Sequence, residues 1–260
     1  MKKYFYGGHF IDNNDIRSIK LSLNKTLSQG PLIKKFEKNV ANYFNSKYCV
    51  AVSSATAALH ISIAALNLKK HSKAFVPTMT FVATANACIY NRLNLNLIDI
   101  DSTNYNIDLD ILEQQLSKES KKEKKIIIPV HFGGLPCDMS KVHKIAKKYN
   151  CYVVEDASQA MGARFKNKLI GNCKFSDFTI FSLHPVKSIT TGEGGLILTN
   201  NYKFFKKVSI LRAHGLVKDS KHHWKNDMKF LGFNYKFTEF QSALGISQLQ
   251  KLKKFLSKRH

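Results

Sequence analysis

The chain has 260 residues, of which 44% are hydrophobic and 23% are charged, and this balance excludes a disordered chain and allows a sizeable core. The formal net charge is +23, but 36 of the 41 basic residues are lysines scattered along the chain, whereas nucleic-acid recognition favours clustered arginine, so we expect no nucleic-acid partner. No apolar run reaches the length of a membrane span and the five cysteines lack metal-ligand spacing, so we expect a cytoplasmic protein without a membrane partner or a metal site.

Short apolar runs alternate with segments of helical periodicity in the first 155 residues. Strands are predicted at 48–52, 74–76, 95–100, 126–130 and 151–154, and helices at 55–68, 81–90, 109–116 and from Asp138 onward. Continuous apolar strands that alternate with helices are typical of a parallel sheet buried on both faces. The pattern therefore predicts an α/β fold with a mostly parallel sheet between two layers of helices.

The alternation changes after Cys173. Two further strands are predicted at 178–181 and 195–199, and the loop between them is too short for a helical crossover. We therefore expect that these two strands do not form a right-handed βαβ unit. The last predicted element is a helix over 238–256 with Thr238 as its N-cap, and residues 1–260 are interpreted as one domain.

Chemically useful side chains follow the carboxyl ends of the predicted strands, where open α/β sheets place their ligands. Ser54 and Thr56 open a helix directly after a strand, which suits a phosphate, although helix capping by Ser54 is the simpler explanation. Glu155 and Asp156 end another strand, and one of them could hold a protonated ring nitrogen rather than serve as a structural acid.

Lys187 follows a strand and precedes the glycine cluster at 192–195. A lysine is a solvated surface residue by default, but a desolvated lysine on a rigid loop is an amine nucleophile. The cluster does not fit the dinucleotide pattern G-x-G-x-x-G, because Ile197 occupies the last position. A phosphate cradle, an aspartate for a pyridinium nitrogen and a Schiff-base lysine are together the parts of a pyridoxal phosphate site.

The chain resembles the sugar aminotransferases of the DegT/DnrJ/EryC1/StrS family, within fold-type I of the pyridoxal phosphate enzymes. The resemblance extends over residues 6–252. The segments that carry it are 27–31, 54–59, 80–86, 155–160, 182–195 and 232–235. It implies the large domain of a fold-type I transferase, and the small C-terminal domain that follows in family members is expected to be missing from this chain.

The resemblance also implies roles for individual residues. Lys187 would bind pyridoxal 5'-phosphate as a Schiff base and move the reacting proton, and Asp156 would keep the ring nitrogen protonated. Phe81 would stack on the ring, a core aromatic being the alternative, and Gln159 would hydrogen-bond near the phenolic oxygen. The implied phosphate contacts are Ala55, Thr56 and Ser182 in one subunit and Asn234 from a partner subunit, so the family's site implies a homodimer.

Residues 131–139 and 212–245 look most like one branch of the family. Members of that branch transfer an amino group from L-glutamate to a UDP-linked 4-keto-6-deoxy-N-acetylhexosamine in pseudaminic acid biosynthesis, by a ping-pong reaction. A dehydrating branch carries histidine in place of the lysine, and Lys187 argues against it. The alternative from another class is an inactive or split-gene remnant that binds the cofactor but needs a C-terminal domain or partner chain for turnover.

Overall fold

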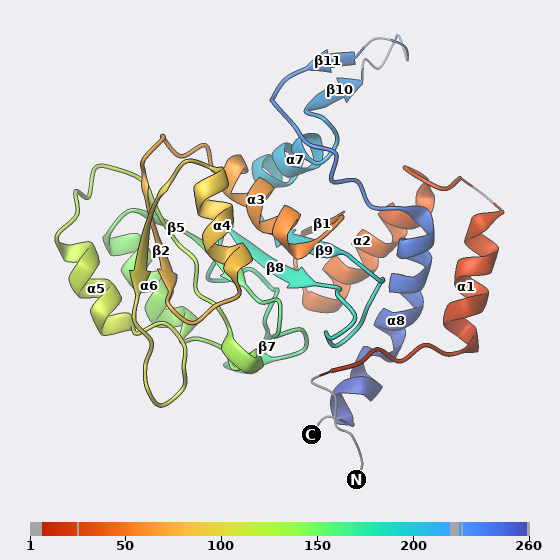
Figure 1. The fold of residues 1–260 in the computed structure, drawn as a ribbon, viewed down its shortest axis with the longest axis horizontal. Helices are drawn as coiled ribbons and strands as arrows, with labels where there is room; N and C mark the ends of the chain where they lie inside the picture. The colour runs from red at the N-terminus through yellow and green to blue at the C-terminus, as the bar shows by residue number, and fades with distance from the viewer. Residues whose placement is uncertain (1–6, 25, 219–223, 225, 259–260) are drawn as a thin grey trace.

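A seven-stranded sheet forms the centre of the computed structural model, which describes residues 7–24, 26–218, 224 and 226–258 (Figure 1). The strand order is β1-β9-β8-β5-β4-β2-β3. The strands are β1 (Tyr48–Val52), β2 (Lys73–Pro77), β3 (Asn94–Ile98), β4 (Lys125–Ile127), β5 (Cys151–Asp156), β8 (Phe178–Ser182) and β9 (Gly195–Thr199). β9 runs antiparallel to both of its neighbours, and the other pairings are parallel. The prediction of a mostly parallel sheet is confirmed.

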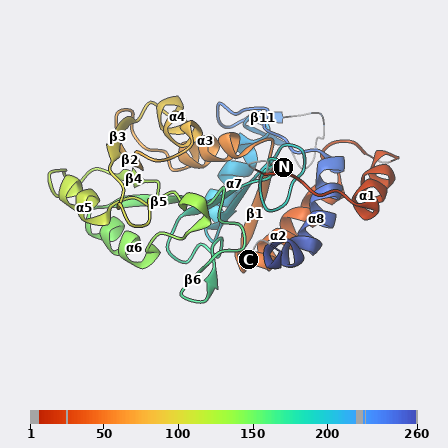
Figure 2. The ribbon, with the colours of Figure 1, turned by 60° about the horizontal axis from the view of Figure 1, so that its bottom comes forward.

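Helices cover both faces of the sheet (Figure 2). One face packs against α3 (Ala55–Ala65), α4 (Val82–Tyr90) and α7 (Tyr202–Leu211). The other face packs against α2 (Pro31–Phe44), α5 (Leu109–Ser117), α6 (Met139–Lys148) and α8 (Glu239–Ser257), and α1 (Asn13–Leu23) lies on α8. In β1, Val50 packs in the first layer and Ala51 in the second. Both faces of the strand are therefore buried, and this is why its residues are apolar.

The remaining elements are short. They are the 3₁₀ turn η1 (Phe132–Gly134) and two hairpins, β6 (Arg164–Phe165) with β7 (Lys168–Leu169) and β10 (Leu216–Lys218) with β11 (Asn226–Met228). The strand predicted at 126–130 ends at Ile127, because Pro129 has no N–H to donate and Val130 makes only an isolated bridge. Within the described ranges, no helix is long and apolar enough to cross a membrane.

The strands β8 and β9 form an antiparallel pair, which confirms that they are not a βαβ unit. Ser182 lies opposite Gly195 in the register, and the N–H of Leu183 donates to the carbonyl of Gly194 at 2.9 Å. The loop between these strands is therefore anchored to the sheet at both of its ends. Lys187 lies on this loop.

The N-terminus of α2 is capped by a side chain from another helix. Its N-cap residue is Gly30, which has no side chain to accept the first N–H groups. The carboxylate of Glu239, at the start of α8, accepts the N–H groups of Leu32 at 3.0 Å and Ile33 at 3.1 Å. Glu239 is only 1% exposed, so this contact joins two helices through a buried charge.

We expect Glu239→Ala to lower the free energy of unfolding by about 2–3 kcal/mol, because two buried N–H groups lose an ionised acceptor. Chemical denaturation monitored by circular dichroism measures the change. The exposed Glu123 provides the control, and Glu123→Ala should change the stability by less than about 0.5 kcal/mol. Equal stabilities of the two variants would contradict a capping role for Glu239.

Candidate active site

The carboxyl ends of five strands meet around one cavity of about 510 Å³. This volume lies in the range of small-molecule sites. The predicted site residues that line the cavity are Ala55, Thr56, Phe81, Asp156, Gln159, Ser182 and Lys187. Asn234 is not among the lining residues; it is exposed and forms an isolated bridge with Ala213 on the segment that precedes α8.

The first turn of α3 presents backbone N–H groups at this cavity. Ser54 is the N-cap, and its hydroxyl accepts the N–H of Ala57 at 3.1 Å, which confirms the predicted cap. The N–H groups of Ala55 and Thr56 belong to the same turn, where a helix offers no internal acceptors. An anion such as a phosphate is favoured at such a helix end. Gly195 allows the close packing, because a Cβ there would lie 2.3 Å from the carbonyl oxygen of Ser54.

The two acids that end β5 point in different directions. Glu155 is 3% exposed and turns away from the cavity: it accepts the hydroxyl of Thr179 at 2.9 Å and pairs with Nε2 of His131 at 2.9 Å. Nδ1 of His131 accepts the N–H of Cys137 at 3.1 Å, so Nε2 carries the proton. Of these two acids, Asp156 lines the cavity.

The carboxylate of Asp156 is held at both oxygens. Oδ1 accepts the N–H of Ser158 at 3.1 Å, and Oδ2 accepts the hydroxyl of Thr84 at 2.6 Å. Thr84 was not predicted from the sequence as a site residue. The sequence feature that could have indicated it is a pair of threonines one helical turn apart, because Thr80 and Thr84 lie on the same side of the start of α4. Their hydroxyl oxygens are 2.8 Å apart.

Lys187 has the environment of a reactive amine. Its side chain is half-buried, and this burial lowers the pKa of the Lys187 amine from its ordinary value, while the carboxylate of Asp156 raises it in part. A larger fraction of the Lys187 amine is therefore neutral near neutral pH than for an exposed lysine. Only the neutral amine attacks a carbonyl carbon.

Two other predicted site residues border the cavity. Phe81 is the N-cap of α4, and its ring is 76% exposed although it borders the cavity. Oε1 of Gln159 accepts the N–H of Gly133 at 2.8 Å, which leaves the amide NH₂ as a donor. A phosphate cradle, an acid, an exposed ring face, an amide donor and an amine together fit pyridoxal phosphate.

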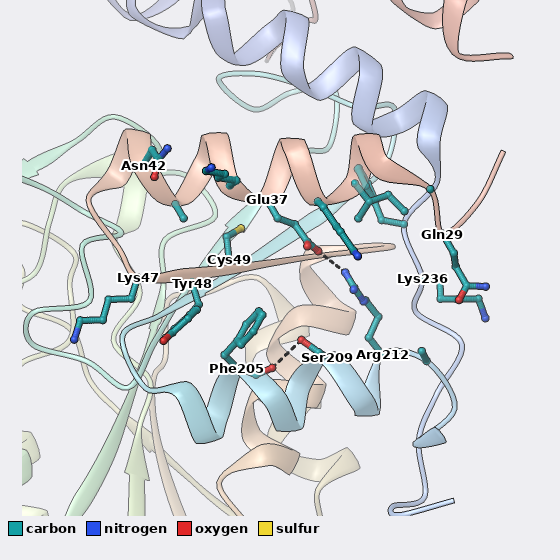
Figure 3. A pocket seen from close by; sticks show the side chains of 17 residues that line it. Gln29, Glu37, Asn42, Lys47, Tyr48, Cys49, Phe205, Ser209, Arg212 and Lys236 are labelled. Carbon is teal, nitrogen blue, oxygen red and sulfur yellow. Dashed lines mark hydrogen bonds and ion pairs between the residues drawn. The ribbon is translucent and has the colours of Figure 1, made fainter. Parts of the chain in front are cut away.

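A second, larger hollow of about 630 Å³ lies between α2 and α7 along the free edge of β1 (Figure 3). Glu37 and Arg212 form an ion pair in its wall. Both side chains also form hydrogen bonds with the edge strand. Glu37 accepts the N–H of Ala51 at 2.9 Å, and Arg212 donates to the carbonyl of Ala51 at 2.7 Å. This pair therefore bonds both backbone groups of Ala51 at the edge of the described sheet. None of the predicted site residues lines this hollow.

Comparison with known proteins identifies the family. Residues 10–260 match the model of the DegT/DnrJ/EryC1/StrS aminotransferase family. The chain belongs to this family. It is 40% identical over 255 residues to a UDP-4-amino-4,6-dideoxy-N-acetyl-beta-L-altrosamine transaminase of Campylobacter jejuni, and this alignment covers 98% of the chain and 66% of that relative.

Solved structures of similar proteins have the same fold. Helicobacter pylori PseC, an aminotransferase involved in the biosynthesis of pseudoaminic acid, superposes with a TM-score of 0.89 at 29% identity, over 97% of the chain and 67% of that structure. A GDP-4-keto-6-deoxy-D-mannose-3-dehydratase of Escherichia coli with bound hydrated PLP gives a TM-score of 0.89 at 30% identity. This superposition covers 99% of the chain and 70% of that structure. The expected fold of a pyridoxal phosphate transferase is thus confirmed. The chain spans 58% and 66% of the length of two curated relatives that it matches.

Proposed function

We propose that this chain binds pyridoxal 5'-phosphate and transfers an amino group from L-glutamate to the 4-keto group of a UDP-linked 4-keto-6-deoxy-N-acetylhexosamine. The observation that carries the proposal is that the half-buried amine of Lys187 borders the same cavity as Asp156 and the first turn of α3. An amine nucleophile, an acid and a phosphate cradle in one cavity are the requirements of this cofactor.

The side chains of the cavity divide the work of binding. The N–H groups of Ala55 and Thr56 would hold the phosphate, because they offer donors at a helix N-terminus. The hydroxyl of Ser182, at the carboxyl end of β8, would add a further donor. Phe81 would cover one face of the ring, and the NH₂ group of Gln159 would donate to the phenolic oxygen. These contacts would orient the cofactor toward Lys187.

Lys187 and Asp156 are the residues proposed to act in the amino-transfer reaction. When bound, the cofactor supplies an electron sink for the carbon that loses its proton. The carboxylate of Asp156 stabilises a positive charge on the ring nitrogen. The Nζ atom of Lys187 would hold the cofactor, and as a neutral amine it would also be the base that takes up the proton of the substrate carbon and returns it. A histidine at this position would suit dehydration, so Lys187 supports amino transfer.

The sugar substrate is inferred from relatives. The Campylobacter jejuni relative is named as a transaminase of a UDP-linked amino-dideoxy sugar, and PseC is named as an aminotransferase of pseudoaminic acid biosynthesis. Identity of 40% over nearly the full chain supports a substrate of the same class. The dehydratase neighbour acts on a GDP-linked sugar, and its 30% identity gives weaker support for that nucleotide.

A second candidate function is cofactor binding without turnover. The chain spans 66% of the length of the Campylobacter jejuni transaminase. On this alternative the cavity binds the cofactor, but a C-terminal domain or a partner chain is needed to close the site around the sugar.

The visible absorption spectrum of the purified 260-residue chain with added pyridoxal phosphate separates these functions. A band of lysine-bound cofactor that L-glutamate bleaches and the keto-sugar restores is expected for the aminotransferase. A band that glutamate leaves unchanged would favour binding without turnover. A chain that folds but binds no cofactor would contradict both.

Covalent capture of pyridoxal phosphate by Lys187 is expected to increase with pH. The neutral amine is the reactive form, and burial lowers the pKa of Lys187, so the midpoint lies below the value of about 10.4 for an exposed lysine. Borohydride trapping at a series of pH values, followed by peptide mapping, measures capture at each lysine. Capture at Lys187 with the same midpoint as at exposed lysines would contradict the role of burial.

We also propose that the chain forms a homodimer through the β10–β11 hairpin, which extends away from the sheet (Figure 1). Large apolar side chains are exposed on this segment, and such a patch is typical of an interface. They are Leu216, Trp224, Met228, Phe230 and Leu231. Asn234 lies three residues after Leu231 and outside the cavity of its own chain, which supports a role for Asn234 at the phosphate of the partner subunit in such a dimer.

Leu231→Asp should convert the dimer into a monomer, because Leu231 is 82% exposed and a buried charge at an interface is costly. Analytical ultracentrifugation measures the shift, and an increase of the dissociation constant by about 100-fold or more is expected. Leu23→Asp is the control, since Leu23 is also exposed but lies on α1. A dimer as stable as the wild type would refute this interface.

A further inference from the structure

The start of α4 is bonded to the acid of the cavity through a fully buried side chain. Thr84 is 0% exposed, and its hydroxyl donates to Oδ2 of Asp156 at 2.6 Å across 72 residues of sequence. The other oxygen, Oδ1, accepts the N–H of Ser158 at 3.1 Å. With one fixed donor on each oxygen, the plane of the carboxylate has one orientation.

The hydrogen bonds around Thr84 have a defined direction. An ionised carboxylate only accepts, so the single proton of the Thr84 hydroxyl goes to Asp156. The hydroxyl of Thr80, 2.8 Å away, must therefore donate to Thr84. Each bond in such a chain strengthens the next one.

The same helical turn also carries the ring-facing aromatic. The N–H of Thr84 donates to the carbonyl of Phe81 at 3.1 Å. One turn of α4 thus places the aromatic side chain at the cavity and holds the carboxylate of Asp156 inside it. A shift of this turn would displace both groups together.

We propose that Thr84 is a positioning residue that holds Asp156 in the orientation needed for the ring nitrogen of the cofactor, an inference that rests on the proposed function. Thr84 is buried and does not line the cavity, whereas Asp156 does. Because a hydrogen bond to a charged group is worth more than a neutral one, its loss should be felt in cofactor binding.

The matched comparison uses three variants. Thr84→Val removes the hydroxyl and keeps the shape, and Thr84→Ser keeps the hydroxyl. Thr179→Val removes an equally buried hydroxyl that donates to Glu155, the neighbouring acid that points away from the cavity. All three affect buried positions, but only the first removes a donor to Asp156.

The dissociation constant of pyridoxal phosphate and the pH midpoint of its visible absorption change are measured in each full-length variant. For Thr84→Val we expect binding weakened by about 10- to 100-fold and a shifted midpoint. Thr84→Ser should restore both to within about threefold, and Thr179→Val should change neither while it lowers the melting temperature. Wild-type binding and midpoint in Thr84→Val would overturn the proposal.

Crystal structures of the cofactor-free variants test the same role without the cofactor. The carboxylate of Asp156 should rotate in Thr84→Val and keep its orientation in Thr84→Ser. An unrotated carboxylate in Thr84→Val would overturn the positioning role. A wild-type chain that binds no cofactor would instead refute the proposed function, so the two failures are distinguishable.

Discussion

Lys187→Ala is expected to lose the visible band of covalently bound cofactor and to slow the half-reaction with L-glutamate by about 10²–10⁴-fold or more, the range that general acid–base catalysis contributes. The physical reason is that one amine both holds the cofactor and moves the proton. The band and the rate should disappear together, because they depend on the same nitrogen. Rapid mixing with glutamate and absorption spectroscopy measure both.

The fold of this variant should be unaffected. Lys187 lies on a loop whose two ends are anchored to β8 and β9, so the removal of its side chain leaves the sheet intact. Lys174→Ala is the control, because Lys174 is exposed on the loop that enters β8 at the opposite end. Normal turnover in Lys187→Ala, or an equal loss in Lys174→Ala, would exclude Lys187 as the reacting amine.

Asp156→Asn should retain the covalent band and lose at least about 100-fold in the rate of the half-reaction, as expected when a preorganised charge is removed from a reacting centre. The neutral amide accepts hydrogen bonds but does not stabilise a positive ring nitrogen. Asp156 also raises the pKa of Lys187, so the pH midpoint of covalent capture should fall further in this variant. Stopped-flow absorption measures the rate, and borohydride trapping measures the midpoint.

Asp177→Asn separates this effect from a general loss of a buried acid. Burial raises the pKa of Asp177, and its Oδ2 accepts the N–H of Val153 at 2.9 Å at the other end of the sheet. An asparagine retains that acceptor, and the half-reaction rate should stay at the wild-type level. A loss confined to the Asp156 variant supports its role, and equal losses would count against it.

The strands and the helices between them were predictable because each has a simple local signal. The apolar runs at 48–52 and 195–199 coincide with β1 and β9, and Ser54, Asp138 and Thr238 are the observed N-caps of α3, α6 and α8. Burial on both faces makes such strands continuous in apolar residues, so the sequence pattern reports them directly.

Two of the elements that were not predicted lack this correspondence. α1 buries Asp15 and Ser22 and exposes Ile16 and Leu21, so its apolar residues do not mark the face that packs on α8. Asp15 is buried there because Lys251 on α8 forms an ion pair with it. The β10–β11 hairpin was also not predicted from the sequence, because its strand over 226–228 is exposed.

The candidate site was predictable only in part. Asp156 was identified because it ends β5, and Lys187 because it lies on the loop that follows β8. Strand ends share one edge of a parallel sheet. The contact between Thr84 and Asp156 joins positions 72 residues apart, and no local sequence pattern predicts it. The role proposed for Asn234 requires a second subunit, so no contact within a single chain would reveal it.

The ion pair on the free edge of β1 has a consequence for the behaviour of the protein at high concentration. An edge strand with open N–H and carbonyl groups can recruit strands from other molecules, and this is a common route to fibrous aggregates. In β1 the groups of Ala51 are already occupied by Glu37 and Arg212. The pair thus acts as a barrier to intermolecular sheet growth, and the cluster of exposed lysines around it, Lys34, Lys38 and Lys47, repels an approaching copy of the same edge.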